Sequence, residues 1–353
     1  MTFAAEASIV NEMGKFLLNG SLYRGSKPVM WSVVEKTALA EAEIEYEDHK
    51  STTIYAKFLV KEAKLDVIKD ANIIIWTTTP WTMPGNRAVA FSKEFNYSLI
   101  KIKATDEQSL AQVDNKIIIA KDLIEEVTKN CKILEWEELL EIKGKDFKDV
   151  ILHHPLSESG YRHKVKMLPA DFVTVDQGTG FVHIAPGHGE DDYFLGKKFN
   201  IEVPETLEGN GNLLDHLPLF GGMHVLRDNS KIADIMSEKN SLIGRGELIH
   251  SYPHSWRSKA PLVFRNTPQW FISMNENNLK SIALKEIEKT TFYPSAGKQR
   301  LHSMIENRPD WCLSRQRAWG IPIPVFINKK TGQPLRDKLV IDRVVKAFKK
   351  NGS

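Results

Sequence analysis

The chain has 353 residues, and its 42% hydrophobic content is enough for two or three compact domains with hydrophobic cores. Its 48 basic and 45 acidic residues leave a net charge of +3, which neither demands nor excludes a nucleic-acid partner. No apolar run approaches the roughly 20 residues of a membrane helix and the N-terminus lacks a signal-peptide pattern, so we expect a cytoplasmic protein with no membrane partner.

The first predicted element is a helix. Apolar residues at helical spacing run from Phe3 to Leu17 and stop before Asn19 and Gly20, a pair that commonly ends a helix. Farther along, short β-branched runs separated by Gly, Asn, Asp and Pro predict the strands of a barrel or a sandwich. These runs are NIIIWTT (72–78), RAVAF (87–91), YSLIKIK (97–103), KIIIA (116–120), KMLPADFVTV (166–175) and GFVHIA (180–185).

More helices are predicted after these strands. The stretch APGHGEDDYFLGKKF (185–199) leads from a strand into a helix, and a surface helix follows with Asp228 as its cap. LKSIALKEIEKT (279–290) predicts a further helix, and WCLSRQRAWGIPIPVF (311–326) a strand that leaves a polar loop. We expect an α+β chain in three parts: an N-terminal stem segment (1–50), a β-rich, barrel-like domain (51–245) and a returning segment (246–353).

The first candidate site is WTTTPWTMPGNR (76–87), where a strand runs into a loop lined with hydroxyls. Thr77, Thr78, Thr79 and Thr82 can each donate and accept hydrogen bonds, and Pro80 forces Thr79 toward an extended conformation. Such a loop could hold a sugar, an ester or a water molecule. The alternative is that threonine simply favours strands.

The second candidate is HIAPGHGEDD (183–192). A metal-dependent hydrolase that uses His183, His188 and Asp192 is conceivable, but the spacing matches neither HExxH nor a usual zinc framework. Acidic residues at a helix start are explained by capping and by the helix dipole. Asp192 could instead pair with a ligand ammonium group, whereas a histidine on a strand face, such as His183, is more often a hydrogen-bonded core residue.

Two further stretches mix cations with aromatic side chains. The first contains His250, Tyr252, His254, Trp256, Arg257 and Lys259, and the second contains Arg308, Arg315 and Arg317 around two tryptophans. The first suits contact with phosphate or RNA, as in a non-catalytic RNA-binding module, or a solvated structural loop. The second fits a domain-packing segment with salt bridges. The only cysteines, Cys131 and Cys312, indicate neither a disulfide framework nor a metal site.

Taken together, these stretches resemble isoleucyl-tRNA synthetases, class I enzymes with a large editing insertion called CP1. WTTTPWTMPGNR, GTGFVHIAPGHGEDDY, HSYPHSWRSKAPLVFRNTPQWF and DWCLSRQRAWGIPIP look like that family's blocks, in the family's order. TTTPWT is typical of the isoleucyl enzymes, because valyl and leucyl relatives typically have Arg before the proline and an acid after it. One departure is that Ser255 and Ser258 stand where many members carry cysteines, which removes a metal-site argument there.

A second departure concerns the synthetic site. The family's HIGH-like and KMSKS signatures, which bind the nucleotide, are missing from the 353 residues. The resemblance therefore implies an internal fragment: the editing domain, flanking stem segments and part of a Rossmann-like catalytic domain. No aminoacylation is expected from it. ATP and Mg are implied only for the full-length parent, and no cofactor or metal for editing.

The implied activity is hydrolysis of mischarged Val-tRNA(Ile), with valyl-adenylate as a second substrate. In this very enzyme class, one methylene in an apolar synthetic pocket is known to be worth only about 1–3 kcal/mol, so a second sieve is required. The implied partners are the acceptor end of tRNA(Ile) and valine as the edited amino acid, and the chain is expected to be a monomer.

The resemblance also implies residue roles. Thr77, Thr78, Thr79 and Thr82, with Asn86, line the pocket for the ribose, the adenine and the attacking water. His183 closes the side-chain end of the pocket against isoleucine, and Asp192 fixes the substrate ammonium group. Thr77, Thr78, Thr79 and Asp192 are the expected catalytic residues. Since no Ser-His-Asp or Cys-His arrangement is evident, we expect direct attack by water without a covalent intermediate.

Overall fold

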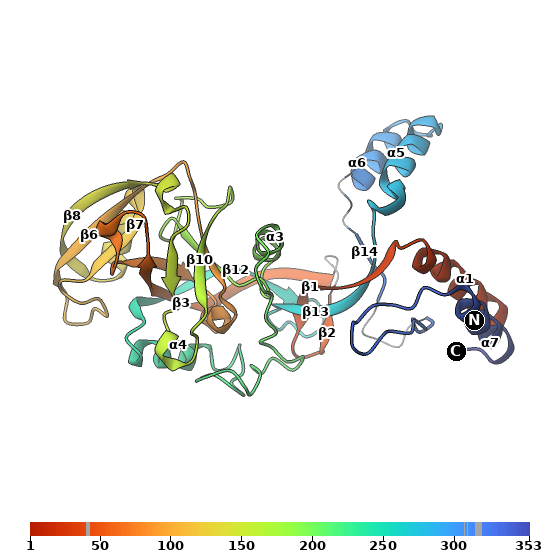
Figure 1. Ribbon diagram of the computed structural model, residues 1–353, viewed down its shortest axis with the longest axis horizontal. Coiled ribbons are helices and arrows are strands. Elements are labelled where there is room, and N and C mark those ends of the chain that lie inside the picture. The colour runs from red at the N-terminus through yellow and green to blue at the C-terminus, as the bar shows by residue number, and fades with distance from the viewer. Residues whose placement is uncertain (40–42, 307, 309, 315–319) are drawn as a thin grey trace. The chain divides into compact units, whose positions relative to one another are not determined.

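The computed structural model describes residues 1–39, 43–306, 308, 310–314 and 320–353 (Figure 1). Its chain divides into two compact units, of which one is Pro28–Asn266 and the other combines Met1–Lys27 with Thr267–Ser353. No helix among the described residues is long and apolar enough to cross a membrane. The predicted division into three parts at residues 50 and 245, and the Rossmann-like character of the last part, stay predictions.

The unit Pro28–Asn266 is built on a large sheet. Its strand order, within the described residues, is β11-β5-β10-β9-β3-β4-β7-β6-β8, and β12 pairs with β3. The strands are β3 (Ile44–Glu62), β4 (Asn72–Thr77), β5 (Ala88–Phe91), β6 (Asn96–Thr105), β7 (Lys116–Ala120), β8 (Ile133–Lys143), β9 (Ile151–His153), β10 (Lys164–Pro169), β11 (Phe181–Ile184) and β12 (Leu242–Ser255). The helices are α2 (Ile124–Asn130), α3 (Glu190–Lys198) and α4 (Asn229–Glu238).

The β-rich character predicted for this part is confirmed, but the sheet is not a closed barrel. Closure would require the end strands β11 and β8 to pair, and no such pairing joins the described strands. Side chains alternate between two apolar layers, as the period of a strand requires. On β5, Val89 and Phe91 belong to the main core, whereas Ala88 and Ala90 face a second cluster that includes Leu195 of α3.

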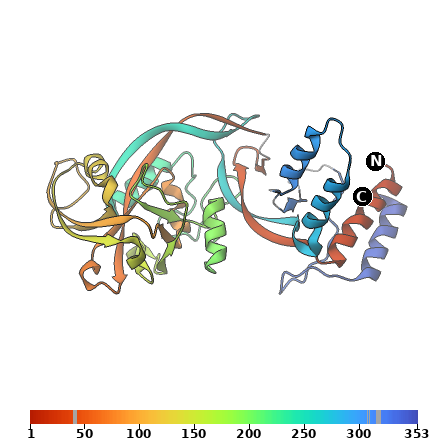
Figure 2. The same cartoon turned by 90° about the horizontal axis from the view of Figure 1, so that it is seen from above.

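A long two-stranded ribbon was not predicted. β3 and β12 pair antiparallel from Ala56 and Leu242 to Ile44 and Ser255, and Figure 2 shows the two strands side by side. Much of this ribbon is exposed, for example at Tyr46. Without one buried face, it lacks the apolar alternation by which a strand is recognised.

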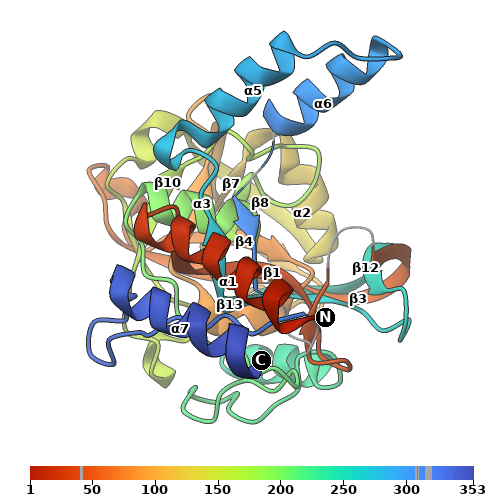
Figure 3. The ribbon, with the colours of Figure 1, turned by 90° about the vertical axis from the view of Figure 1, so that its right-hand side faces the viewer.

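The other compact unit is mainly helical. Its helices are α1 (Phe3–Leu18), α5 (Leu279–Lys289), α6 (Ala296–Glu306) and α7 (Lys338–Asn351). The helices predicted over 3–17 and 279–290 are therefore confirmed. α1 and α7 lie side by side (Figure 3), and Ala7, Val10 and Phe348 are buried together between them. A smaller sheet, whose strands do not belong to this unit alone, has the order β14-β13-β1-β2. Its strands are β14 (Trp311–Cys312), β13 (Val263–Ile272), β1 (Leu22–Ser32) and β2 (Thr37–Ala38).

Two predicted strands are shorter than expected. The strand predicted over 166–175 ends at Pro169, because its parallel partner β5 ends at Phe91 and leaves the following residues without a ladder. Of the described residues in the strand predicted over 311–326, Trp311–Cys312 form a strand and 320–326 do not, because two prolines there lack the N–H that a ladder needs. Asp228 does precede α4, but its carboxylate accepts from the His224 N–H at 2.8 Å and does not cap the helix.

Candidate active site

The hydroxyl loop begins where β4 ends and continues as a short 3-10 helix, Pro80–Gly85. The Thr79 N–H donates to Thr77 Oγ1 at 3.1 Å, and the two hydroxyl oxygens are 3.2 Å apart. Thr82 Oγ1 lies 3.5 Å from Thr79 Oγ1 and donates to the Thr79 carbonyl at 2.8 Å. Pro80 starts the turn with its fixed φ, so that these three hydroxyls converge. Thr78 is half-buried and takes no part in this chain of hydroxyls.

His183 reaches this loop from a distant segment of the sequence. Antiparallel pairing of β11 with β5 places His183 opposite Val89, and its side chain is only 8% exposed. Its Nε2 lies 2.9 Å from Thr82 Oγ1 and its Nδ1 lies 2.7 Å from Asn86 Nδ2. The structure therefore brings Thr77, Thr79, Thr82, Asn86 and His183 into one hydrogen-bonded cluster.

The direction of the hydrogen bonds in this cluster follows from Asn86. Its Nδ2 lies 2.9 Å from the Ala88 carbonyl, so the NH₂ end of the amide faces His183 and Nδ1 of the imidazole is an acceptor. The imidazole proton is then on Nε2 and is donated to Thr82, whose own proton goes to the Thr79 carbonyl.

The direction of these hydrogen bonds matters because Thr82, His183 and Asn86 have the arrangement of a nucleophile, a general base and a residue that orients the base. Activation of a hydroxyl would require His183 Nε2 to accept the Thr82 proton, whereas here Nε2 donates. Burial, with a smaller contribution from His188, also lowers the pKa of His183 to about 3. His183 is therefore a neutral, weakly basic wall of the site.

Asp192 lies in the first turn of α3, after Gly189 at the N-cap. Its Oδ2 accepts from the Ala185 N–H at 2.7 Å, which ties α3 to the residue just after β11. A Cβ at Gly189 would lie 3.0 Å from the Asp192 carboxyl carbon, so glycine permits this approach. Burial raises the pKa of Asp192 to about 7, and the neighbouring Asp191 charge acts in the same direction. Among the described residues, no cationic partner therefore holds the pKa of this carboxylate down.

His188 supports the loop from another side. Its Nδ1 lies 3.0 Å from the Phe264 carbonyl, its Nε2 lies 2.5 Å from Thr206 Oγ1, and its ring meets Trp81 edge-on at 5.0 Å. Burial lowers the pKa of His188 to about 4.

Metal binding finds no support at this site. Both ring nitrogens of His183 and of His188 already have hydrogen-bond partners. In the part of the chain that the structure describes, no three His, Cys, Asp or Glu side chains are placed to hold a metal ion.

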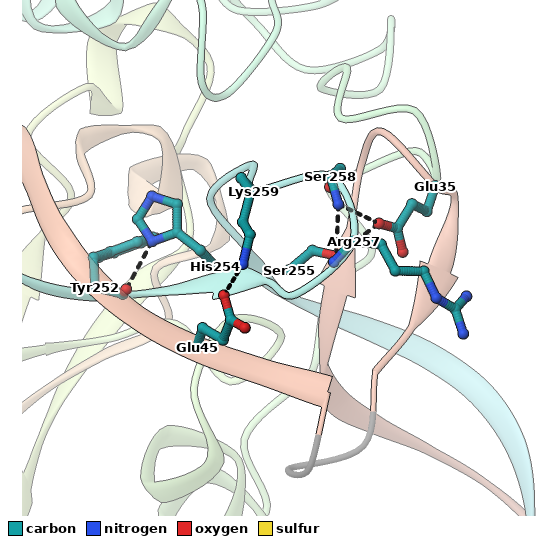
Figure 4. Close-up of polar contacts among 8 residues, drawn as sticks. All are labelled: Glu35, Glu45, Tyr252, His254, Ser255, Arg257, Ser258 and Lys259. Carbon is teal, nitrogen blue, oxygen red and sulfur yellow. Dashed lines mark hydrogen bonds and ion pairs between the residues drawn. The ribbon is translucent and has the colours of Figure 1, made fainter.

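The cation-rich stretch at the end of β12 is held by acidic partners (Figure 4). Ser255 Oγ donates to Glu35 Oε1 at 2.6 Å, and the Ser258 N–H donates to the same oxygen at 3.2 Å. Burial acts to raise the pKa of Glu35, but the hydrogen bonds from Ser255 and Ser258 and the Arg257 charge together lower it. Ser255 and Ser258, which stand where the resemblance places cysteines, thus hold a carboxylate.

The other groups of this stretch are also paired. Lys259 forms an ion pair with Glu45, and His254 Nδ1 donates to the Tyr252 carbonyl at 2.8 Å. Arg257 lies 3.5 Å from Glu43. These contacts favour the interpretation as a structural loop. In the other cation-rich stretch, Arg308 is exposed, whereas Arg315 and Arg317 lie outside the described residues.

Comparison with known proteins gives consistent results. Residues 1–353 match the family model described as tRNA synthetases class I (I, L, M and V). The chain is 51% identical to an isoleucine–tRNA ligase of Pelagibacter ubique, over 100% of this chain and 39% of that protein, and 46% identical to that of Gluconobacter oxydans, of which it covers 38%. It thus spans 38–39% of the length of these relatives.

Solved structures with similarity to this chain include two domains of leucyl enzymes. One is the GlLeuRS-CP1 crystal structure, with a TM-score of 0.42 and 16% identity over 55% of this chain and 98% of that one. The other is the editing domain of the P. knowlesi cytosolic leucyl-tRNA synthetase, with a TM-score of 0.41 and 12% identity over 60% and 99%.

Proposed function

Because this chain belongs to the class I tRNA synthetases of the I, L, M and V group, we propose that it hydrolyses Val-tRNA(Ile), and valyl-adenylate as well, as the editing part of an isoleucyl enzyme. The similarity to isoleucine–tRNA ligases over the whole chain supports the choice of tRNA(Ile). In this proposal the chain binds the acceptor end of tRNA(Ile), and valine is the amino acid that it removes. The full-length parent enzyme is a monomer and works in the cytoplasm.

One observation carries this proposal: hydroxyls from one loop and a buried histidine from a distant strand meet in a single cluster. An aminoacyl ester on a terminal ribose offers hydroxyls, a carbonyl and an ammonium group. Thr77 and Thr79 retain capacity to donate or accept hydrogen bonds to the ribose and to a water molecule. His183 limits the length of the amino-acid side chain, and Asp192 pairs with the ammonium.

The reaction then needs no protein nucleophile. A water molecule adds to the ester carbonyl and the bond to the ribose oxygen breaks. That oxygen takes the proton that the water loses, so a ribose hydroxyl and free valine are the products. Thr77, Thr78, Thr79 and Asp192 position the substrate and the water, which by itself lowers the barrier. An acyl-enzyme on Thr82 is disfavoured because the Thr82 proton points to the Thr79 carbonyl and His183 is a donor.

Aminoacylation is expected to be absent from this chain. The 353 residues lack the signatures that bind the ATP phosphates, so no isoleucyl-adenylate should form. Isoleucine-dependent exchange of pyrophosphate into ATP measures this step directly. Exchange above the background of a reaction without isoleucine would show that the chain holds a working synthetic site.

Deacylation should depend on pH in a bell-shaped manner. Pairing with the ammonium needs the ionised Asp192 carboxylate, so kcat/KM should fall as the pH drops below the pKa of about 7. On the alkaline side the substrate α-amino group loses its proton, ordinarily at about 7.7–8.0, and kcat/KM should fall again. Measured kcat/KM for Val-tRNA(Ile) across both limbs tests this. If the fall in kcat/KM at low pH persists in Asp192→Asn, it is caused by a group other than Asp192.

The same group should make stability depend on pH. The pKa of Asp192 in the folded chain is raised above the ordinary 3.8, so the folded state holds this proton more tightly than the unfolded state. The contribution of this carboxyl to the free energy of unfolding is complete below its ordinary pKa and is lost as the pH rises through about 7. The melting temperature of the parent should therefore fall relative to that of Asp192→Asn over this window. A difference that stays constant across it would show that this carboxyl has an ordinary pKa.

A further inference from the structure

His154 lies just beyond β9 and is almost completely buried, with 1% of its surface exposed. Its Nδ1 accepts from the Leu156 N–H at 3.1 Å, so the ring proton is on Nε2. That Nε2 donates to the Met83 carbonyl at 3.0 Å. The ring stacks on Tyr161 at 4.9 Å and meets Phe58 edge-on at 6.0 Å. Packing and hydrogen bonds thus fix both the tautomer and the orientation of this imidazole.

The carbonyl that His154 holds belongs to the hydroxyl loop. Met83 lies between Thr82 and Asn86, and its carbonyl also accepts from the Asn86 N–H at 3.1 Å. The Asn86 side chain in turn donates to His183. A continuous path therefore runs from His154 through the Met83 carbonyl and Asn86 to His183, the wall of the proposed pocket.

The hydrogen bond from His154 should persist over the working pH range. Burial lowers the pKa of His154 to about 3; the hydrogen bond to the Met83 carbonyl opposes this shift, and the nearby His163, His183 and Arg87 add smaller effects in the direction of burial. The ring therefore stays neutral, with its proton on Nε2. The hydrogen bond from His154 to the Met83 carbonyl is thus present throughout the working pH range.

We propose that His154 is a positioning residue of the editing site, which through the Met83 carbonyl holds the loop that carries Thr82 and Asn86 in register with His183. This inference rests on the proposed function. His154 contacts no substrate in this scheme. It holds the geometry on which rate and selectivity depend, and a displacement of about 1 Å at such a site can cost on the order of 100-fold in rate.

Two variants of the full 353-residue chain separate positioning from packing. His154→Gln and His154→Asn both lose the aromatic stack, but the Gln amide nitrogen can reach the place of Nε2 and keep the bond to Met83, whereas Asn is too short. The readouts are kcat and KM for Val-tRNA(Ile), cleavage of Ile-tRNA(Ile), and hydrogen exchange at the Asn86 amide. Thermal melts show how much stability each variant loses.

We expect His154→Asn to lower kcat by about 10- to 100-fold with little change in KM, and to speed exchange at the Asn86 amide. His154→Gln should keep most of the parent's kcat and most of the protection of the Asn86 amide from exchange. Equal kcat in the two variants, or Asn86 exchange unchanged in His154→Asn, would overturn the proposal. A parent chain without deacylation would defeat the proposed function, and Asn86 exchange in the two variants would still decide whether His154 holds the loop.

Discussion

Asp192→Asn is expected to lower Val-tRNA(Ile) deacylation by about 100-fold, because a hydrogen bond to a charged group contributes about 1.5–3 kcal/mol and the variant leaves the substrate ammonium unpaired. The local structure should not change. The Asn side-chain oxygen can still accept from the Ala185 N–H, the contact that Asp192 makes at 2.7 Å. The variant should melt at the temperature of the parent or, above neutral pH, somewhat higher.

Two further variants separate recognition from helix capping. Asp191→Asn removes an exposed acid from the same turn of α3 and should leave deacylation unchanged at a pH above the pKa of Asp192, where that carboxylate is ionised in either chain. Asp192→Ala loses both the charge and the bond to Ala185, so it should be inactive and less stable by about 1 kcal/mol. Thermal melts beside deacylation time courses for the three variants decide the matter. An Asp192→Asn chain that keeps most of its activity would refute recognition of the ammonium by charge.

His183→Ala is expected to convert a selective hydrolase into one that also cleaves correctly charged Ile-tRNA(Ile). The imidazole is neutral and donates only to Thr82, so its proposed work is steric. Its removal leaves Thr82 bonded to the Thr79 carbonyl and Asn86 bonded to the Ala88 carbonyl, and the fold should survive. Since one methylene in a pocket is worth about 1–3 kcal/mol, relief of the clash should raise isoleucyl cleavage by at least about 10-fold.

His188→Ala is the matched control for this variant. It also removes a buried histidine close to the loop, but one bonded to Thr206 and Phe264 and not to Thr82. Rates of release of valine and of isoleucine from the two charged tRNAs, with a melt for each variant, give the comparison. A folded His183→Ala chain that cleaves the valyl ester normally and still spares the isoleucyl ester would show that the sieve is elsewhere.

Local chemistry makes the hydroxyl loop recognisable from the amino-acid sequence alone. Three threonines after an apolar strand, with Pro80 setting the turn, predict polar groups at a strand end, and β4 does end at Thr77. The helix at α3 follows in the same way from Gly189 and the first-turn acids. These features depend on neighbours within a few residues, so their pattern is visible in the sequence.

The contacts that define the site could not be predicted in this way. Thr82 and His183 are 101 residues apart, and they meet only because β11 pairs with β5 in one particular register. A shift of one residue would turn His183 to the opposite face of the sheet. His154 shows the same limit, because nothing near it in the sequence indicates that its partner is the Met83 carbonyl.

Hydrolysis of Val-tRNA(Ile) beside Ile-tRNA(Ile) by the parent chain tests the central proposal most directly. The measurement is a time course of amino-acid release from each charged tRNA, repeated with a chelator. We predict that the valyl ester is cleaved well above its spontaneous rate, that the isoleucyl ester is spared, and that the chelator has no effect. Tight binding of Val-tRNA(Ile) without cleavage, or cleavage that the chelator abolishes, would contradict the account.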